Sequence, residues 1–180
     1  MGASEIISAL THLVPEASLE AAPSIDVATI YVSSVQLVQT GLALRDAMGF
    51  DFLAEVTAVD YLPREPRYEV VYHLVSIAGR QRLRLKVRVS DEGSVPTVQH
   101  VWPSAGWPER EVWDLFGIPF DGHSDLRRLL MTDDWEGHPL RKDYPVQIRK
   151  TAQTYEPFEV TEQEFRANLE RDRFSRTRPQ

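Results

Sequence analysis

The sequence contains no cysteine, which excludes disulfides, thiolate catalysis and cysteine-ligated iron-sulfur clusters from this chain. It also has no run of the roughly 18 consecutive apolar residues that a membrane-spanning helix requires. The first residues lack the basic region and the long apolar run of a signal peptide. We therefore expect a soluble chain that stays in the cytoplasm.

Glycine is sparse as well, with nine residues scattered singly along 180. Neither the dinucleotide-binding fingerprint nor the phosphate-binding loop of nucleotide hydrolases occurs. The G-x-S-x-G and H-E-x-x-H motifs of two common hydrolase classes are also missing. We expect that this chain does not bind NADH or ATP by itself.

Positive charge is in the minority, because 20 Lys and Arg residues stand against 27 Asp and Glu and the formal net charge is -7. Nucleic-acid binding requires a basic surface that neutralises phosphates, so we expect no nucleic-acid partner. The 42% hydrophobic and 26% charged residues are typical of a globular domain, and 180 residues suffice for one buried core.

Apolar residues at helical spacing predict helices in three segments, residues 4–13, 37–48 and 108–117. Alternating or β-branched patterns predict strands in five segments, residues 25–32, 52–60, 68–77, 81–89 and 97–102. A short turn with Gly79 joins the third and fourth strands into a β-hairpin. The fourth strand has one apolar face and one basic face, made of Arg82, Arg84, Lys86 and Arg88. The basic face is either a solvated sheet face or a docking face for an acidic partner.

The pattern changes after the last predicted helix. Ser124 is suited to cap a short helix over residues 125–131, but beyond Thr132 the periodicity disappears. Thr161 and Glu164 have the spacing of a capping box, which predicts a terminal helix that needs a partner surface. The predicted fold class is α+β, with a small, mostly antiparallel sheet and flanking helices in a domain over residues 1–131. An extended C-terminal arm with that terminal helix follows in residues 132–180.

Histidine and carboxylate side chains concentrate in one short stretch, as they often do at metal sites: His123, Asp125, Asp133, Asp134 and His138. Their spacing fits no standard metal site, so loop histidines that make ordinary hydrogen bonds are the favoured interpretation. A small metal-dependent hydrolase that uses His123, Asp133 and His138 remains the enzyme alternative.

The helix at residues 108–117 carries further charges. Glu109 and Glu111 are two positions apart, so their side chains point away from each other and complement the helix dipole rather than form a catalytic pair. Arg110 and Asp114 are four positions apart on one face and are placed to pair with each other.

All four tryptophans lie within residues 101–145, together with several arginines. Trp, Tyr and Arg dominate interface hot spots, so this segment indicates an interaction surface rather than an active site. For Trp107, Trp113 and Phe116 an equally good interpretation is that they bury the helix in the core.

Two stretches resemble the signature of a known family: WPEREVWDLFGIPFDGHSDLRRLL at residues 107–130 and DWEGHPLRKDYP at residues 134–145. They look like the 30 kDa subunit, also called the C subunit, of bacterial proton-pumping NADH:quinone oxidoreductase, which is respiratory complex I. The core of the match is E-R-E-x-x-D-x-F-G at residues 109–117, followed by His123 and the pair Arg127 and Arg128. Ser124 stands where the family usually has proline.

The resemblance implies a non-catalytic, cofactor-free structural subunit of the peripheral arm, which supports electron transfer from NADH to quinone coupled to proton translocation. FMN, iron-sulfur clusters, NADH and quinone would belong to the complex as a whole. Expected partners are the quinone-site D subunit and the cluster-bearing B and I subunits. Membrane contact is expected only through the complex, on the cytoplasmic side of the bacterial inner membrane. A membrane-bound hydrogenase or a ferredoxin-dependent complex is the related alternative.

We predict structural or inter-subunit contacts, and no catalytic role, for twelve residues of these stretches: Glu109, Arg110, Glu111, Asp114, His123, Asp125, Arg127, Arg128, Arg141, Lys142, Asp143 and Tyr144. The last four are expected in an arm that runs over a neighbouring subunit. Pro139 and Pro145 would keep that segment extended and unable to bury itself.

Overall fold

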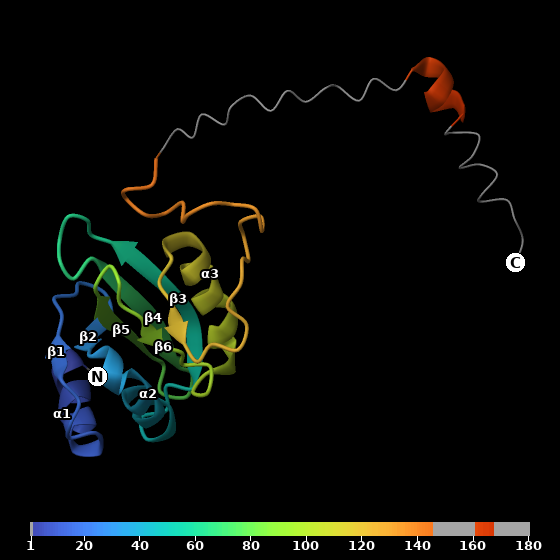
Figure 1. Cartoon of the computed structure of the whole chain (residues 1–180). Coiled ribbons are helices and arrows are strands. Elements are labelled where there is room, and N and C mark those ends of the chain that lie inside the picture. Colours follow the sequence, from blue (N-terminus) through green and yellow to red (C-terminus); the bar gives the residue numbers. More distant parts are fainter. Residues whose placement is uncertain (1, 146–160, 168–180) are drawn as a thin grey trace, which may run out of the picture. The chain divides into compact units, whose positions relative to one another are not determined.

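A five-stranded sheet forms the framework of the chain, and Figure 1 shows it with helices packed around it. The structure is a computed structural model that describes residues 2–145 and 161–167. The first of these ranges contains the helices α1 (Ala3–Leu13), α2 (Leu37–Asp46) and α3 (Gly106–Phe116), and short 3-10 turns at Ser34–Gln36 and Pro103–Ala105. Its strands are β1 (Leu19–Ala21), β2 (Ala28–Val32), β3 (Phe52–Asp60), β4 (Tyr68–Ser76), β5 (Gln81–Val89), β6 (Val95–Pro96) and β7 (Phe120–Asp121).

The strand order in the main sheet is β1-β2-β5-β4-β3. Neighbouring strands are antiparallel except β2 and β5, which run parallel. β4 and β5 form the predicted hairpin, in which Tyr68 lies opposite Val89 and Ser76 opposite Gln81. The predicted α+β fold, with a mostly antiparallel sheet and flanking helices, is therefore confirmed. The short strand β1 and the small parallel pair of β6 and β7 were not predicted.

One hydrophobic core joins all three helices to the sheet, because inward strand positions and one face of each helix belong to the same buried cluster. Representative members are Ile6, Leu10, Leu44, Tyr72, Leu85 and Val112. The alternation predicted for residues 81–89 places Leu83, Leu85 and Val87 in this core and leaves the basic residues on the opposite face. Among the described residues, no helix has the length and apolar character that crossing a membrane requires.

The strand predicted over residues 97–102 is wrong. Only Val95 and Pro96 form a strand there, and the following backbone turns. The N–H groups of Val101 and Trp102 donate to the Val98 carbonyl, at 2.9 and 2.8 Å. The N–H of Val98 itself donates to a carboxylate oxygen of Glu109. These backbone donors are therefore not available for hydrogen bonds to a neighbouring strand.

The helix predicted over residues 125–131 is also wrong, since this segment contains bends and no helical turn. Three of its backbone N–H groups donate to one side chain on α3, described below, instead of to carbonyls within the segment. In a helix these three N–H groups would donate to the carbonyls of residues 125–127, so the helix cannot form after Ser124.

Contacts group Met1–Tyr144 into one compact unit and Pro145–Gln180 into a second. Residues 132–144, which the sequence assigned to the arm, lie in the first unit; how far an arm extends beyond Tyr144 stays a prediction. In the second unit Thr161 and Glu164 form the predicted capping box. The Thr161 N–H donates to Oε2 of Glu164 at 3.0 Å, and the Glu164 N–H donates to Oγ1 of Thr161 at 3.3 Å. A helical turn follows at residues 162–167.

Candidate functional site

Asp114 on α3 organises the loop that follows the helix. Its fully buried carboxylate forms an ion pair with Arg128, Oδ1 to Nη1 at 2.9 Å. The other oxygen, Oδ2, accepts three backbone N–H groups, at 3.0, 2.7 and 2.9 Å, from Leu129, Leu130 and Met131. Burial raises the pKa of Asp114, but these N–H groups and Arg128 outweigh it and bring the pKa down to about 2. The carboxylate is therefore ionised and occupied by structural partners.

Arg110, one turn earlier on α3, binds the same loop through its carbonyls. Its Nε and Nη2 donate to the carbonyl oxygens of Arg127 and Arg128, each at 2.6 Å. Its Nη1 pairs with Asp125 at 3.2 Å. The prediction that Arg110 and Asp114 pair with each other is wrong, because each binds the loop instead.

The C-terminal turn of α3 is closed by the chain that follows it. Its exposed carbonyls would otherwise lack partners. The Asp114 carbonyl accepts from Arg128 and from Nδ1 of His138, and the Phe116 carbonyl accepts from Nε of Arg141 at 2.9 Å. Gly117 then adopts φ 77°, and a Cβ there would lie 2.5 Å from the His138 ring. Glycine is required at this position for both reasons.

Glu109 was expected to complement the helix dipole, but the structure gives it a further role. Its side chain is fully buried; Oε2 accepts the Thr97 hydroxyl at 2.6 Å and Oε1 accepts the Val98 N–H at 2.8 Å. Burial raises the pKa of Glu109 despite these hydrogen bonds. Glu111, by contrast, lies exposed on the helix.

His123 and His138 make the ordinary hydrogen bonds that the sequence favoured. The Asp125 N–H donates to Nδ1 of His123 at 3.0 Å, so Nε2 carries the proton and donates to the Gly106 carbonyl at 2.9 Å. Within residues 2–145 and 161–167, no three His, Asp or Glu side chains are grouped as metal ligands would be. The structure thus does not bring His123, Asp133 and His138 together.

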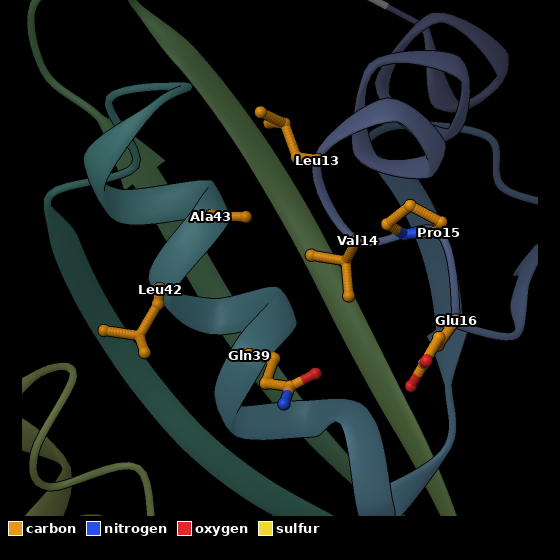
Figure 2. A pocket seen from close by; sticks show the side chains of 7 residues that line it. All are labelled: Leu13, Val14, Pro15, Glu16, Gln39, Leu42 and Ala43. Carbon is orange, nitrogen blue, oxygen red and sulfur yellow. The ribbon is translucent and has the colours of Figure 1, made fainter.

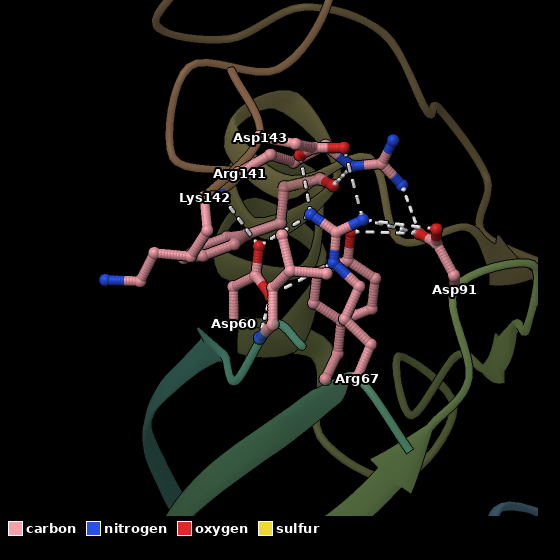
Figure 3. Close-up of polar contacts among 9 residues, drawn as sticks. Asp60, Arg67, Asp91, Arg141, Lys142 and Asp143 are labelled. Atoms are coloured by element: carbon pink, nitrogen blue, oxygen red, sulfur yellow. Dashed lines mark hydrogen bonds and ion pairs between the residues drawn. The ribbon is translucent and has the colours of Figure 1, made fainter. Parts of the chain in front are cut away.

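A second network surrounds Arg67, whose side chain is only 3% exposed (Figure 3). It pairs with Asp60 at 2.8 Å, Asp91 at 3.1 Å and Asp143 at 2.6 Å. The Lys142 N–H also donates to Asp60, at 2.8 Å. We call these residues, Asp60, Arg67, Asp91, Arg141, Lys142 and Asp143, the Arg67 cluster.

Charge in the Arg67 cluster is held in its ionised form. Burial raises the pKa of Asp60, yet hydrogen bonds from Arg67 and from two backbone N–H groups bring it down to about 2. The hydrogen bond from Arg67 lowers the pKa of Asp143 as well. Sequence reasoning named neither Arg67 nor Asp91, because no local pattern links positions this far apart in the chain.

Residues 141–144 were expected to run over a neighbouring subunit, and here they bind their own domain. Arg141 pairs with Asp91 at 3.1 Å, and the Tyr144 hydroxyl donates to the Glu136 carbonyl at 3.1 Å. The Lys142 side chain points away from the other labelled residues of the Arg67 cluster in Figure 3. The segment can therefore pack on its own domain, and its contacts with other subunits stay a prediction.

Three of the four basic residues on the outer face of β5 form ion pairs within the chain. Lys86 pairs with Glu69 at 2.9 Å, Arg88 with Glu20 at 3.0 Å, and Arg84 with Asp26 at 3.5 Å. These ion pairs favour the solvated sheet face over a docking face for an acidic partner.

The aromatic residues of α3 divide between the two interpretations. Phe116 is buried and Trp113 is partly buried against the core, as expected if they anchor the helix. Trp107 differs, because 65% of its surface is exposed.

A separate groove of about 440 Å³ lies between α1 and α2, where Leu13, Val14 and Leu42 line it with mostly apolar atoms (Figure 2).

Fold and site together define an α+β protein whose buried charged side chains hold its own loops in place. A family profile described as "Respiratory-chain NADH dehydrogenase, 30 Kd subunit" matches residues 30–150. The chain belongs to this family of NADH-quinone oxidoreductase subunits, which confirms the resemblance found in its sequence.

Individual relatives agree with the family assignment. The chain is 44% identical to the NADH-quinone oxidoreductase C subunit of Roseiflexus sp. (strain RS-1) over 153 residues, 83% of this chain and 88% of that one. It is 53% identical to the C subunit of Geobacter sulfurreducens over 121 residues, 66% of this chain and 75% of that one. A chain in a structure of the membrane-bound sulfane sulfur reductase, an archaeal respiratory membrane complex, superposes with a TM-score of 0.68 at 25% identity, covering 88% of this chain and 96% of that one.

Proposed function

We propose that this chain is a non-catalytic structural subunit of the peripheral arm of NADH:quinone oxidoreductase and binds no cofactor itself. It would contact the quinone-site D subunit and the cluster-bearing B and I subunits, on the cytoplasmic side of the bacterial inner membrane. FMN and the iron-sulfur clusters would be bound by other subunits.

The observation that carries this proposal is that the family-motif carboxylates of Glu109 and Asp114 already accept hydrogen bonds from their own chain. Asp114 accepts three backbone N–H groups and one guanidinium, and Glu109 accepts a hydroxyl and a backbone N–H. A general base needs a free lone pair within hydrogen-bond reach of substrate, and a nucleophile needs an accessible atom. Both carboxylates are fully buried and hydrogen-bonded to their own chain, which favours a structural role.

The absence of cysteine supports the assignment of the clusters to other subunits, because thiolates are the usual ligands of iron-sulfur clusters. The proposed contacts with other subunits include the exposed members of the motif, such as Glu111 and Arg127.

The test is affinity purification of the tagged full-length chain from its native membranes, followed by mass spectrometry of its partners. We expect the quinone-site and cluster-bearing subunits to co-purify, whereas the chain expressed alone should contain neither metal nor flavin. An untagged strain controls for background. A chain that purifies without partners and contains stoichiometric zinc, manganese or flavin would contradict the proposal.

A related assembly with another electron donor is the second candidate. It is favoured by the likeness to a chain of an archaeal respiratory membrane complex named for sulfane sulfur reduction. The purified complex decides between the two. Oxidation of NADH with quinone as acceptor supports the first candidate, and oxidation of reduced ferredoxin without NADH activity supports the second.

A further inference from the structure

Trp107 stands at the start of α3 with 65% of its surface exposed, whereas Glu109 and Arg110 on the same helix are buried. A large exposed aromatic ring on a rigid helix is typical of the anchor residue of a protein interface. The guanidinium carbon of Arg110 lies 5.6 Å from the centre of this ring. The ring is thus held beside a cation that is itself fixed by the loop after α3.

A cavity of about 340 Å³ adjoins the ring. Its lining includes Gln99, Gly106, Trp107, His123, Asp125 and Arg127, and we call this cavity and its rim the Trp107 surface. Its walls are tied together by hydrogen bonds from His123 to the Gly106 carbonyl at 2.9 Å and from the Ser124 N–H to Oε1 of Gln99 at 3.1 Å. An incoming group would meet a shape that is already formed, which lowers the entropic cost of binding.

The charge of the Trp107 surface is opposite to that of the chain. Two arginines, Arg110 and Arg127, share a single carboxylate, that of Asp125. The Arg127 side chain is 72% exposed and uses Nε for Asp125. Within the described residues, its two terminal NH2 groups have no partner, so they are available to an incoming carboxylate. This local excess of positive charge lies on a chain with a net charge of -7.

We propose that the Trp107 surface binds an acidic segment of another subunit of the same oxidoreductase. An aspartate or glutamate of that segment pairs with Arg127, and the apolar part of the segment packs against the Trp107 ring. This inference rests on the proposed function and adds the chemistry of the partner. The groove between α1 and α2 carries no comparable indication, since its lining gives no sign of what would cover it.

The test places a photo-crosslinking amino acid at position 107 of the tagged full-length chain, in the native host, and identifies the crosslinked peptide after purification of the assembly. A crosslinker at Ile77, which is 66% exposed in the turn between β4 and β5, is the matched control. We expect position 107 to crosslink to a peptide of another subunit that contains Asp or Glu. A peptide without acidic residues, a lipid, or no crosslink in an assembly that still co-purifies would overturn the inference and leave the proposed function intact.

A charge reversal gives an independent measurement. Arg127→Glu should weaken co-purification of that subunit roughly tenfold, the size of effect seen when a well-placed interface residue is lost. Arg82→Glu makes the same charge change on the exposed face of β5 and should leave co-purification unchanged. Circular dichroism of both variants confirms that the domain is folded. Equal losses for the two variants, or no loss for Arg127→Glu, would contradict the inference.

Discussion

The Arg67 cluster and the Trp107 surface both combine arginine with aspartate, but in opposite proportions. In the Arg67 cluster three aspartates pair with two guanidiniums, those of Arg67 and Arg141, and the Arg67 side chain is only 3% exposed. At the Trp107 surface two guanidiniums share one aspartate, and the Arg127 side chain is 72% exposed. An ion-pair network that is complete within the chain stabilises the fold, whereas one with unused donors is suited to recognise a partner.

The largest expected effect in this comparison is that of Arg67→Met. Removal of the guanidinium leaves the buried Asp60 charge without its ion pair, which should lower the free energy of unfolding by about 3 to 5 kcal/mol. Urea denaturation at neutral pH measures it. Arg64→Met in the same loop is the control, because the 52% exposed Arg64 side chain should contribute less than about 1 kcal/mol. Equal effects for both variants would remove the distinction between a buried network and a surface pair.

Acidification should weaken the same interior. Asp60 and Asp114 have pKa values of about 2 in the folded chain against a usual 3.8. A lowered folded-state pKa contributes stability that is present above pH 4 and lost as the pH falls toward 2. The loss should be about 2 kcal/mol for each carboxylate. Urea denaturation at pH 5 and at pH 2.5 measures it.

Glu109 should oppose this trend, since burial raises its pKa and its protonation then stabilises the folded state as the pH falls. Glu109→Gln should therefore lose stability more steeply on acidification than the unchanged chain. If the free energy of unfolding of the unchanged chain were the same at pH 5 and at pH 2.5, the ionised state of Asp60 and Asp114 in the fold would be contradicted.

A smaller effect is expected at the rim of the Arg67 cluster. Asp143→Asn removes a partner that is 51% exposed while Asp60 and Asp91 remain, so the free energy of unfolding should fall by only about 1 kcal/mol. The more sensitive measurement is hydrogen exchange of the Lys142 amide, which now donates to Asp60. We expect faster exchange there and an unchanged rate in β4. Unchanged exchange at Lys142 would show that Asp143 does not hold this segment.

The smallest effect on stability is expected at the Trp107 surface. Trp107→Ala and Arg127→Gln should each change the free energy of unfolding by less than about 0.5 kcal/mol, because both side chains are mostly exposed. Thermal or urea denaturation of the isolated chain checks this. A loss comparable to that of Arg67→Met would mean that this surface belongs to the fold and not to recognition.

The sheet was predictable because its signal is local. The strand signals of residues 52–60, 68–77 and 81–89 come from neighbouring residues, and the bounds of β3, β4 and β5 match them closely. Burial alternates along β5, whereas β3 has a bulge between Leu53 and Glu55 and β4 is buried on both faces. The wrong predictions lie where a side chain distant in sequence accepts the backbone N–H groups that a strand or helix would need. Glu109 binds Val98 and Asp114 binds residues 129–131, so the predicted strand and short helix do not form.

The candidate site shows the same division. The motif residues of α3 and its loop were recognised from sequence, because they lie close together in an unusual pattern. Arg67 and Asp91 were missed, since Asp60, Arg67, Asp91 and Asp143 become neighbours only when the hairpin and residues 141–144 come together. A buried arginine cannot be recognised from the sequence around it, because only the fold shows which acidic residues become its partners.

The central claim is that the chain is a structural part of the oxidoreductase and not an independent catalyst. The most direct measurement is separation of native membranes by native gel, with the tagged chain, NADH-dependent quinone reduction and flavin content assayed in every fraction. We expect the tagged chain to co-migrate with the activity and the flavin, and the chain expressed alone to show neither. A tagged chain in a separate fraction, or an isolated chain with flavin or NADH-dependent activity, would contradict it.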